Sequence, residues 1–452
     1  MIELEPLVNK RIPLKFNGAE LRFDLSHALF SSFDVDAGTR LLLKTIARDP
    51  VLAAARRVLD AGCGTGILGL AVAKAFPEAE VTLRDRDSLA AAFSDRNRLI
   101  NKLRDSPARV DPETGERRPA YRAPQVGLGL LADGREGGPY DYVISNLPAK
   151  AGGPVLEAFF LRAGSAGATP GLLAPGGRLA VVIVHPLADA ASLWIEKAGL
   201  AVVATARGSM HKVFVCERAT SAVGAASGDA ADSGGADAPP PGARSGVGAG
   251  ADTQLDLDGI DMRAYVRREG RFRLGAAGYP ARGFWGLPEF DTPSFGTALA
   301  ADLAERVLAG SLVRAALIVN PGIGHLALWA AKRLGTSVIT GASRDLLSLA
   351  ATGANLAAVG GATYRAVDSL RLDELPGPSQ DLLLDAPDIV PGYDWIEQSW
   401  KRAEQLVKSG GTYLAICPPT EIARLEKRRA SGWRLLGERR KRGASVMAWR
   451  RG

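Results

Sequence analysis

The stretch Val58-Leu59-Asp60-Ala61-Gly62-Cys63-Gly64-Thr65-Gly66-Ile67-Leu68-Gly69 decides the fold of this chain. It is typical of an apolar strand that ends in an acid and is followed by a glycine turn and a helix of small residues. Glycines let the backbone turn sharply and approach a ligand closely, because they carry no Cβ. The spacing Gly64-x-Gly66-x-x-Gly69 alone matches a dinucleotide-binding fingerprint, and an ordinary glycine turn is the plain alternative.

Two acids favour a different adenosine ligand. Asp60 stands directly before the first glycine, and Asp85 ends the next apolar strand, Val81-Thr82-Leu83-Arg84-Asp85. A strand, a glycine turn, a helix and a second acid at this spacing agree with one another. We therefore favour a cofactor loop over an ordinary turn.

The composition is that of a globular protein. A length of 452 residues predicts two or three domains. Three cysteines and four histidines are scattered, so we expect neither a disulfide framework nor a metal site. The acidic start is unlike a signal peptide, and no apolar run is long enough for a membrane span. We expect a cytoplasmic protein without a membrane partner.

A formal net charge of +7 favours polyanionic partners. Many basic residues gather in residues 424–451, with Trp433 and Trp449 among them. Arginine and tryptophan together can hold phosphates and stack on bases. A solvated helix face and tail is an equally weighted alternative.

The chain repeats itself on either side of a low-complexity segment. Residues 219–253 consist mainly of Ala, Gly, Ser, Asp and Pro, and we expect a disordered linker there. Short apolar strands alternate with helical stretches in both flanking parts, which implies βαβ units. We predict an α/β fold made of two tandem Rossmann-like domains, residues 1–218 and 254–452. Each would have a mostly parallel sheet with helices on both faces.

The second copy differs where a ligand would bind. Asn320 stands in for Asp60, the third glycine of the turn is missing, and Ser343 falls near the position of Asp85. The core pattern is kept while the polar groups are lost. We therefore expect a degenerate domain that binds no cofactor.

A third strand of the first half ends in a residue with an amide side chain, Asn146. Open α/β sheets bind ligands beyond the carboxyl ends of their strands, and the strand from Asp141 leads to Asn146 there. The Asn146 side-chain carbonyl and the backbone carbonyl of Leu147 can accept hydrogen bonds there, while Pro148 keeps the turn stiff. The alternative is that Asn146 merely caps a turn.

These motifs, together with Asp36, Gly38 and Thr39 at the start of a preceding helix, resemble class I S-adenosylmethionine-dependent methyltransferases. The match is to the "small-domain" family, which includes the ribosomal RNA guanine-N2 enzymes of both subunits. In that family the strand-end acid faces the methionine amino group and the second acid takes the ribose hydroxyls. The cofactor-binding residues that the resemblance implies are Asp60, Gly62, Gly64, Gly66, Asp85, Arg86, Leu130, Asp36 and Thr39. As a local device, Asp36 is also a suitable helix N-cap.

The Asn146 strand is similar to the Asn-Pro-Pro-aromatic motif of enzymes that methylate planar exocyclic nitrogens. Leu147 replaces the first proline, and Ala149 replaces the aromatic residue that would stack on a flipped base. A stacking wall must then come from elsewhere. The candidates are Tyr140, Phe33 and Phe30.

The leading hypothesis is an S-adenosylmethionine-dependent N-methyltransferase that acts on an exocyclic base nitrogen of ribosomal RNA. The degenerate second domain would serve as an RNA-docking platform through its basic residues. One alternative keeps the enzyme and changes the acceptor to a protein amide or a small metabolite. Another is a non-catalytic RNA-binding assembly factor that retains the cofactor loop.

Overall fold

The computed structural model describes the chain in several ranges. These are residues 3–30, 32–107, 109–110, 117–118, 120–164, 171–219 and 254–452. The predicted linker at 219–253 lies outside the described residues, apart from residue 219. Its disorder and the two domain boundaries therefore stay predictions.

The first lobe begins with a hairpin and continues with alternating strands and helices. Its strands are β1 (Lys10–Phe16), β2 (Ala19–Leu25), β3 (Arg57–Ala61), β4 (Glu80–Asp85), β5 (Arg109–Val110), β6 (Arg117–Arg118), β7 (Gln125–Leu128), β8 (Tyr140–Asn146), β9 (Leu173–Val184), β10 (Leu200–Arg207) and β11 (His211–Arg218). Its helices are α1 (Ala37–Ile46), α2 (Pro50–Ala54), α3 (Ile67–Ala75), α4 (Ser88–Ile100), α5 (Gly153–Gly164) and α6 (Ala188–Lys197).

The second lobe repeats this plan from its own hairpin onward. Its strands are β12 (Val266–Leu274), β13 (Ala277–Phe284), β14 (Ala315–Val319), β15 (Val338–Ser343), β16 (Thr363–Asp368), β17 (Gln380–Asp385), β18 (Val407–Cys417), β19 (Trp433–Lys441) and β20 (Ala444–Arg451). Its helices are α7 (Phe295–Val307), α8 (His325–Trp329), α9 (Leu346–Val359), α10 (Trp395–Leu406) and α11 (Pro419–Lys427).

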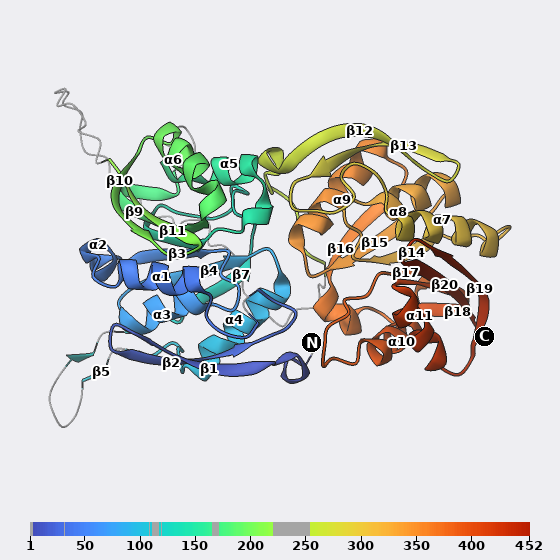
Figure 1. The fold of residues 1–452 in the computed structure, drawn as a ribbon. Helices are drawn as coiled ribbons and strands as arrows, with labels where there is room; N and C mark the ends of the chain where they lie inside the picture. Colours follow the sequence, from blue (N-terminus) through green and yellow to red (C-terminus); the bar gives the residue numbers. More distant parts are fainter. Residues whose placement is uncertain are drawn as a thin grey trace, which may run out of the picture.

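Figure 1 shows the lobes side by side, the first in blue to green and the second in yellow to red. Within the described residues each lobe has a seven-stranded sheet. The orders are β10-β11-β9-β8-β3-β4-β7 and β16-β15-β14-β17-β18-β20-β19. In the first sheet the strands β7, β4, β3, β8 and β9 pair in parallel, and in the second sheet β16, β15, β14, β17 and β18 do so. The hairpin that completes each sheet, β10-β11 in the first and β19-β20 in the second, pairs antiparallel. The predicted tandem α/β fold is confirmed.

Helices cover both faces of the sheets, as predicted. Successive side chains of a strand point to opposite faces, and in β3 Val58 joins the core under α1 and α3, whereas Leu59 joins the core under α5 and α6. The second core also crosses the junction between the lobes, since Phe284 and Leu347 of the second lobe pack into it. Each lobe therefore buries apolar surface against the other.

The pairing register fixes which residues of the two copies are equivalent. Asp60 lies opposite Leu83 and Ile144, while Ile318 lies opposite Gly341 and Leu384. Ile318 therefore occupies the place of Asp60, and the prediction that Asn320 stands there is wrong by two positions.

The rest of the turn follows the same register. Asn320 takes the place of Gly62, and both residues have positive φ (53° and 75°). Ser343 ends β15 as Asp85 ends β4, as predicted. By the same register Ala386 stands where the first copy has Asn146. The second copy therefore lacks counterparts of the Asp60, Asp85 and Asn146 side chains, which supports its description as degenerate.

The basic C-terminal region is part of the second sheet and no tail. Strands β19 and β20 form its edge hairpin. Trp449 is fully buried and Trp433 is 6% exposed, and both pack against Trp400 and Tyr413. Of the two equally weighted interpretations of this region, base stacking by Trp433 and Trp449 does not hold, because both fill the core of the second lobe.

Replacing Trp449 with alanine should lower the free energy of unfolding by about 3–5 kcal/mol, the usual cost of removing a buried aromatic side chain. The control is Arg434→Ala on the exposed side of the same hairpin, which should change stability by less than about 0.5 kcal/mol. Chemical denaturation measures both. Equal effects of the two changes would contradict the buried position of Trp449.

Candidate active site

The carboxyl ends of three neighbouring parallel strands form the candidate site. Strand β3 lies between β4 and β8, so Asp60 stands between Asp85 and Asn146 along one edge of the sheet. The sequence predicted this grouping, because parallel strands end at the same edge. The three residues come from positions more than 20 residues apart.

The glycine turn after β3 is held by backbone bonds to the neighbouring strand β4. The amides of Gly62 and Cys63 both donate to the Arg84 carbonyl, at 2.8 and 3.0 Å. Gly66 begins helix α3 in the left-handed region with φ 83°. A Cβ there would lie 2.9 Å from Ser94 Oγ, whereas a Cβ on Gly64 would meet no atom within 4 Å. Gly64 thus borders open space, as expected of a ligand cradle.

Asp60 is a buried carboxylate with one oxygen unpaired. Its Oδ2 accepts the Gly69 amide at 2.7 Å, and its Oδ1 has no hydrogen-bond partner. Burial raises the pKa of Asp60 to about 7, and the nearby charge of Asp85 adds to that rise. An unpaired buried oxygen is costly, so this position favours a ligand that donates a hydrogen bond or carries positive charge.

Asp85 ties the turn to the following helix. Its Oδ2 accepts the Gly64 amide and its Oδ1 accepts the Asp87 amide, both at 2.9 Å. Burial raises the pKa of this carboxyl as well. Each carboxylate oxygen has two lone pairs, so Asp85 keeps acceptor capacity for two further hydroxyl donors.

The amide of Asn146 is oriented by the segment that precedes α1. Its Nδ2 donates to Asp36 Oδ2 at 3.1 Å and to Thr39 Oγ1 at 3.0 Å. Asp36 also caps α1 by accepting the amides of Gly38 and Thr39. The carboxylate cannot donate, so the nitrogen of Asn146 must face it and the carbonyl Oδ1 faces away. The structure thus brings Asp36, Thr39 and Asn146 together.

Leu147 and Pro148 continue from β8 toward the surface. Leu147 is buried and donates its amide to the Val182 carbonyl at 3.1 Å, while Pro148 is exposed. This leaves the Leu147 carbonyl at the strand end beside Asn146. The turn that follows, Ala149–Ala151, brings no aromatic ring.

Only part of the predicted stacking wall lies near this edge. Tyr140 is wrong as a candidate, because it is buried at the opposite, amino end of β8. Phe30 and Phe33 are 77% and 64% exposed on the segment before Asp36. Phe33 packs edge-on against the ring of His27, with centroids 5.1 Å apart.

Two further predicted cofactor residues, Leu130 and Arg86, follow the ends of β7 and β4. Leu130 is buried after β7, and its amide donates to Asp133 at 2.9 Å. The Arg86 guanidinium points into the second lobe, where its Nη2 donates to the Gly286 carbonyl and to Asp345. The Arg86 side chain therefore contacts the second lobe, and cofactor binding by Arg86 stays a prediction.

Two residues on α4 that were not predicted as site residues support the glycine turn from behind. Ser94 Oγ donates to the Gly64 carbonyl, and Asn97 Nδ2 donates to the Thr65 carbonyl at 2.9 Å. The second copy makes the same bonds from Thr352 and Asn355. Their recurrence at one spacing in both halves was the signal that could have found them.

The described residues hold no group of three or more histidine, cysteine or acidic side chains suited to a metal ion. They also hold no helix with the length and apolar character that crossing a bilayer requires.

Comparisons with known proteins identify relatives for part of the chain. Residues 20–116 match the family model of the methyltransferase small domain. The ribosomal RNA small subunit methyltransferase C of Pseudomonas putida is 37% identical over 103 residues, 22% of this chain and 30% of that protein. The ribosomal RNA large subunit methyltransferase G of Shewanella pealeana is 35% identical over 82 residues, 18% of this chain and 19% of that protein. The chain thus spans a third or less of these relatives' length. The predicted resemblance to the small-domain family is confirmed.

One solved structure matches the whole arrangement. The 16S rRNA N2 G1207 methyltransferase of T. Thermophilus, described in complex with AdoMet and guanosine, aligns over 98% of both chains. Its TM-score is 0.61 and its sequence identity is 17%. At this identity the match shows the fold, and its coverage extends the likeness to both lobes.

Replacing Asp60 with asparagine should change how stability depends on pH. Because the folded-state pKa of about 7 lies above the ordinary aspartate value of 3.8, the folded protein binds one more proton than the unfolded chain between these two pH values. The Asp60 contribution therefore falls as pH rises through this window. The free energy of unfolding of the variant minus that of wild type should grow by up to about 1.4 kcal/mol per pH unit.

The window runs from about pH 4 to 7, and the difference should level off above it. Asp189→Asn, a change on the exposed side of α6, should give a curve parallel to wild type. Denaturant unfolding at several pH values measures all three proteins. If the Asp60 variant gave a stability curve parallel to that of wild type over this window, the pKa of Asp60 would not be raised in the folded protein.

Proposed function

We propose that this chain is an S-adenosylmethionine-dependent methyltransferase that modifies an exocyclic base nitrogen of ribosomal RNA. The observation that carries the proposal is the fixed amide of Asn146, with its nitrogen bound to Asp36 and Thr39. This arrangement leaves an acceptor oxygen at the end of β8, two residues beyond Ile144, which pairs with Asp60 on the neighbouring strand β3. An acceptor for an amino group and the buried, unpaired oxygen of Asp60 then stand on adjacent strands at the same end of the sheet.

The residues present fit S-adenosylmethionine. Asp60 Oδ1 suits its ammonium group, the spare lone pairs of Asp85 suit its ribose hydroxyls, and Gly64 leaves room for close approach. When bound, the cofactor supplies a methyl group that its sulfonium already activates. The turn, with Gly62 and Gly66, would hold it without a metal ion.

The chain's own contribution is to position the acceptor nitrogen. An exocyclic amino group is a poor nucleophile, because its lone pair is delocalised into the ring. Accepting its two N–H bonds at Asn146 Oδ1 and the Leu147 carbonyl would orient the nitrogen and increase its electron density. Such positioning and electrostatic stabilisation account for much of the rate in group transfer.

RNA as the acceptor rests on charge and on relatives. The formal net charge of +7 favours a polyanion, and the partial relatives are described as ribosomal RNA methyltransferases. A basic docking platform in the second lobe keeps only its arginines as support, and several of these are paired. Examples are Arg424 with Glu421, Arg428 with Asp394, and Arg439 with Asp302. A cytoplasmic location belongs to the same proposal.

A protein amide or a small metabolite is the second candidate for the methyl acceptor, because Ala149 replaces the aromatic residue that would stack on a base. A protein amide or small metabolite needs no base-stacking wall. The experiment is to incubate the protein with methyl-labelled S-adenosylmethionine and ribosomal RNA, free or assembled, protein extract, or metabolites. Label in RNA supports the proposal, label in another fraction supports the second class, and binding without transfer supports an assembly factor.

In the same assay, Asn146→Ala should lower kcat by about 100-fold or more, as loss of a transition-state hydrogen-bond partner does. Its cofactor affinity should stay within about twofold of wild type, because Asn146 faces the acceptor. Calorimetry and initial rates measure the two quantities. Undiminished turnover would remove Asn146 from the chemistry.

Phe33→Ala should raise KM for RNA about tenfold, since base stacking on an aromatic ring is worth about 1–3 kcal/mol. Cofactor affinity should not change, and Phe33→Tyr, which keeps a ring, should restore KM. Phe30→Ala tests the neighbouring candidate in the same way. If neither alanine variant alters KM, this segment supplies no stacking wall.

A further inference from the structure

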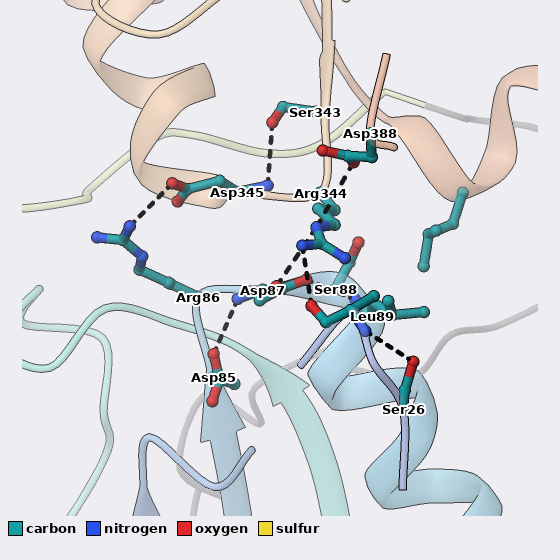
Figure 2. Close-up of polar contacts among 12 residues, drawn as sticks. Ser26, Asp85, Arg86, Asp87, Ser88, Leu89, Ser343, Arg344, Asp345 and Asp388 are labelled. Carbon is teal, nitrogen blue, oxygen red and sulfur yellow. Dashed lines mark hydrogen bonds and ion pairs between the residues drawn. The ribbon is translucent and has the colours of Figure 1, made fainter. Parts of the chain in front are cut away.

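The two lobes meet through the same turn of each copy. The turn after β4 and the turn after β15 run antiparallel across the junction, with Asp87 paired to Asp345. The Ser88 amide donates to the Arg344 carbonyl at 2.8 Å, and the Leu346 amide donates to the Arg86 carbonyl at 2.9 Å. Figure 2 shows the two turns facing each other.

Each turn sends an arginine into the other lobe. Arg86 Nη2 donates to Asp345 Oδ2 and to the Gly286 carbonyl, both at 3.0 Å. Arg344 Nε lies 3.5 Å from Asp87 Oδ2, and its Nη2 donates to the Ala28 carbonyl at 3.1 Å. Gly286 and Ala28 are equivalent positions, so the contacts are exchanged about a pseudo-twofold axis.

The two arginines make equivalent contacts, but the turns that they contact differ in the residue that precedes them. In the first lobe the Asp87 amide donates to the carboxylate of Asp85, whereas in the second the Asp345 amide donates to the hydroxyl of Ser343. Only the turn that Arg344 contacts therefore carries a candidate cofactor acid.

Arg344 also binds the segment that precedes α1. Ala28 lies on the stretch that runs to Asp36, and Asp36 in turn orients the Asn146 amide. One side chain of the degenerate lobe thus touches both segments that line the candidate site.

The Arg344–Asp87 contact is partly shielded from solvent. The side chains of Arg344 and Asp87 are 21% and 25% exposed, so water screens their attraction only in part. Arg344 also lies 3.6 Å from Asp388, which keeps its guanidinium at the junction.

We propose that Arg344 is a positioning residue for the cofactor site of the other lobe, acting through the Asp87 turn on Asp85 and through Ala28 on the segment before α1. This inference rests on the proposed function. It gives the degenerate lobe a defined role, because that lobe supplies the side chain that holds two site segments in register.

The test uses the full-length chain. Arg344→Met keeps the apolar stem and removes the guanidinium, and it should weaken S-adenosylmethionine binding about tenfold, since a hydrogen bond to a charged group is worth about that much. Arg344→Lys keeps a charge near Asp87 and should recover part of the affinity. Asp85→Ala serves as the positive control for loss of binding. Calorimetry measures each dissociation constant.

The matched control is Asp345→Asn, which breaks the mirror-image ion pair with Arg86. It loosens the same junction without removing a contact to Asp87 or Ala28, so cofactor affinity should stay within about twofold. Thermal unfolding of both variants checks that their losses of stability are similar. Equal affinity losses in the two variants, or none in Arg344→Met, would overturn the positioning role.

Hydrogen–deuterium exchange of the cofactor-free protein provides a second readout. Arg344→Met should speed exchange at residues 26–30 and 85–89 by several-fold, and Asp345→Asn should not. Unchanged exchange in Arg344→Met would also overturn the proposal. If wild type binds no S-adenosylmethionine, the proposed function itself fails, which separates that outcome from failure of the Arg344 contact alone.

Discussion

Helix α3 begins so close to the end of strand β3 that the amide of Gly69 donates to the buried carboxylate of Asp60, and the candidate site depends on this contact. A Cβ on residue 69 would lie 3.0 Å from the Asp60 side chain and 2.9 Å from Leu83. Only glycine permits this approach. The contact satisfies one carboxylate oxygen and leaves the other without a partner in a buried place. The resulting desolvation is what makes the strand end selective for a donor ligand.

Much of this site could be predicted from the sequence, because its main residues end strands or begin helices. Asp60, Asp85 and Asn146 each close an apolar run, and parallel strands bring such ends together. Asp36 was recognisable as a helix cap, although its bond to Asn146 across 110 residues was not. Local signals specify the position of a side chain on its own element, and long-range partners depend on how the elements pack.

Where the structure differs from what the sequence suggested, the reason is again the packing of elements that are distant in the sequence. Arg86 follows Asp85 directly, but the turn directs its side chain into the second lobe, where Asp345 attracts it. Trp433 and Trp449 stand among arginines in the sequence, yet in a strand alternate residues face opposite ways, and these two face the core. Asn320 was matched to Asp60 because both are polar residues at the end of an apolar run, whereas the pairing register of the strands places Ile318 opposite the residues that Asp60 faces in the first copy. The positive φ shared by Asn320 and Gly62 identifies the equivalence that the letters concealed.

The side chains that the second copy has kept are those that shape its turn and its junction. Thr352 and Asn355 bind the carbonyls of Gly322 and Ile323, as Ser94 and Asn97 do in the first copy. Both residues lie on α9, whose first turn follows Arg344 directly. The bonds that no longer serve a ligand therefore fix the direction of α9, and with it the place from which Arg344 reaches Asp87. A lobe that only filled space would need its apolar core alone. This one also retains the polar contacts that aim a single guanidinium at its neighbour.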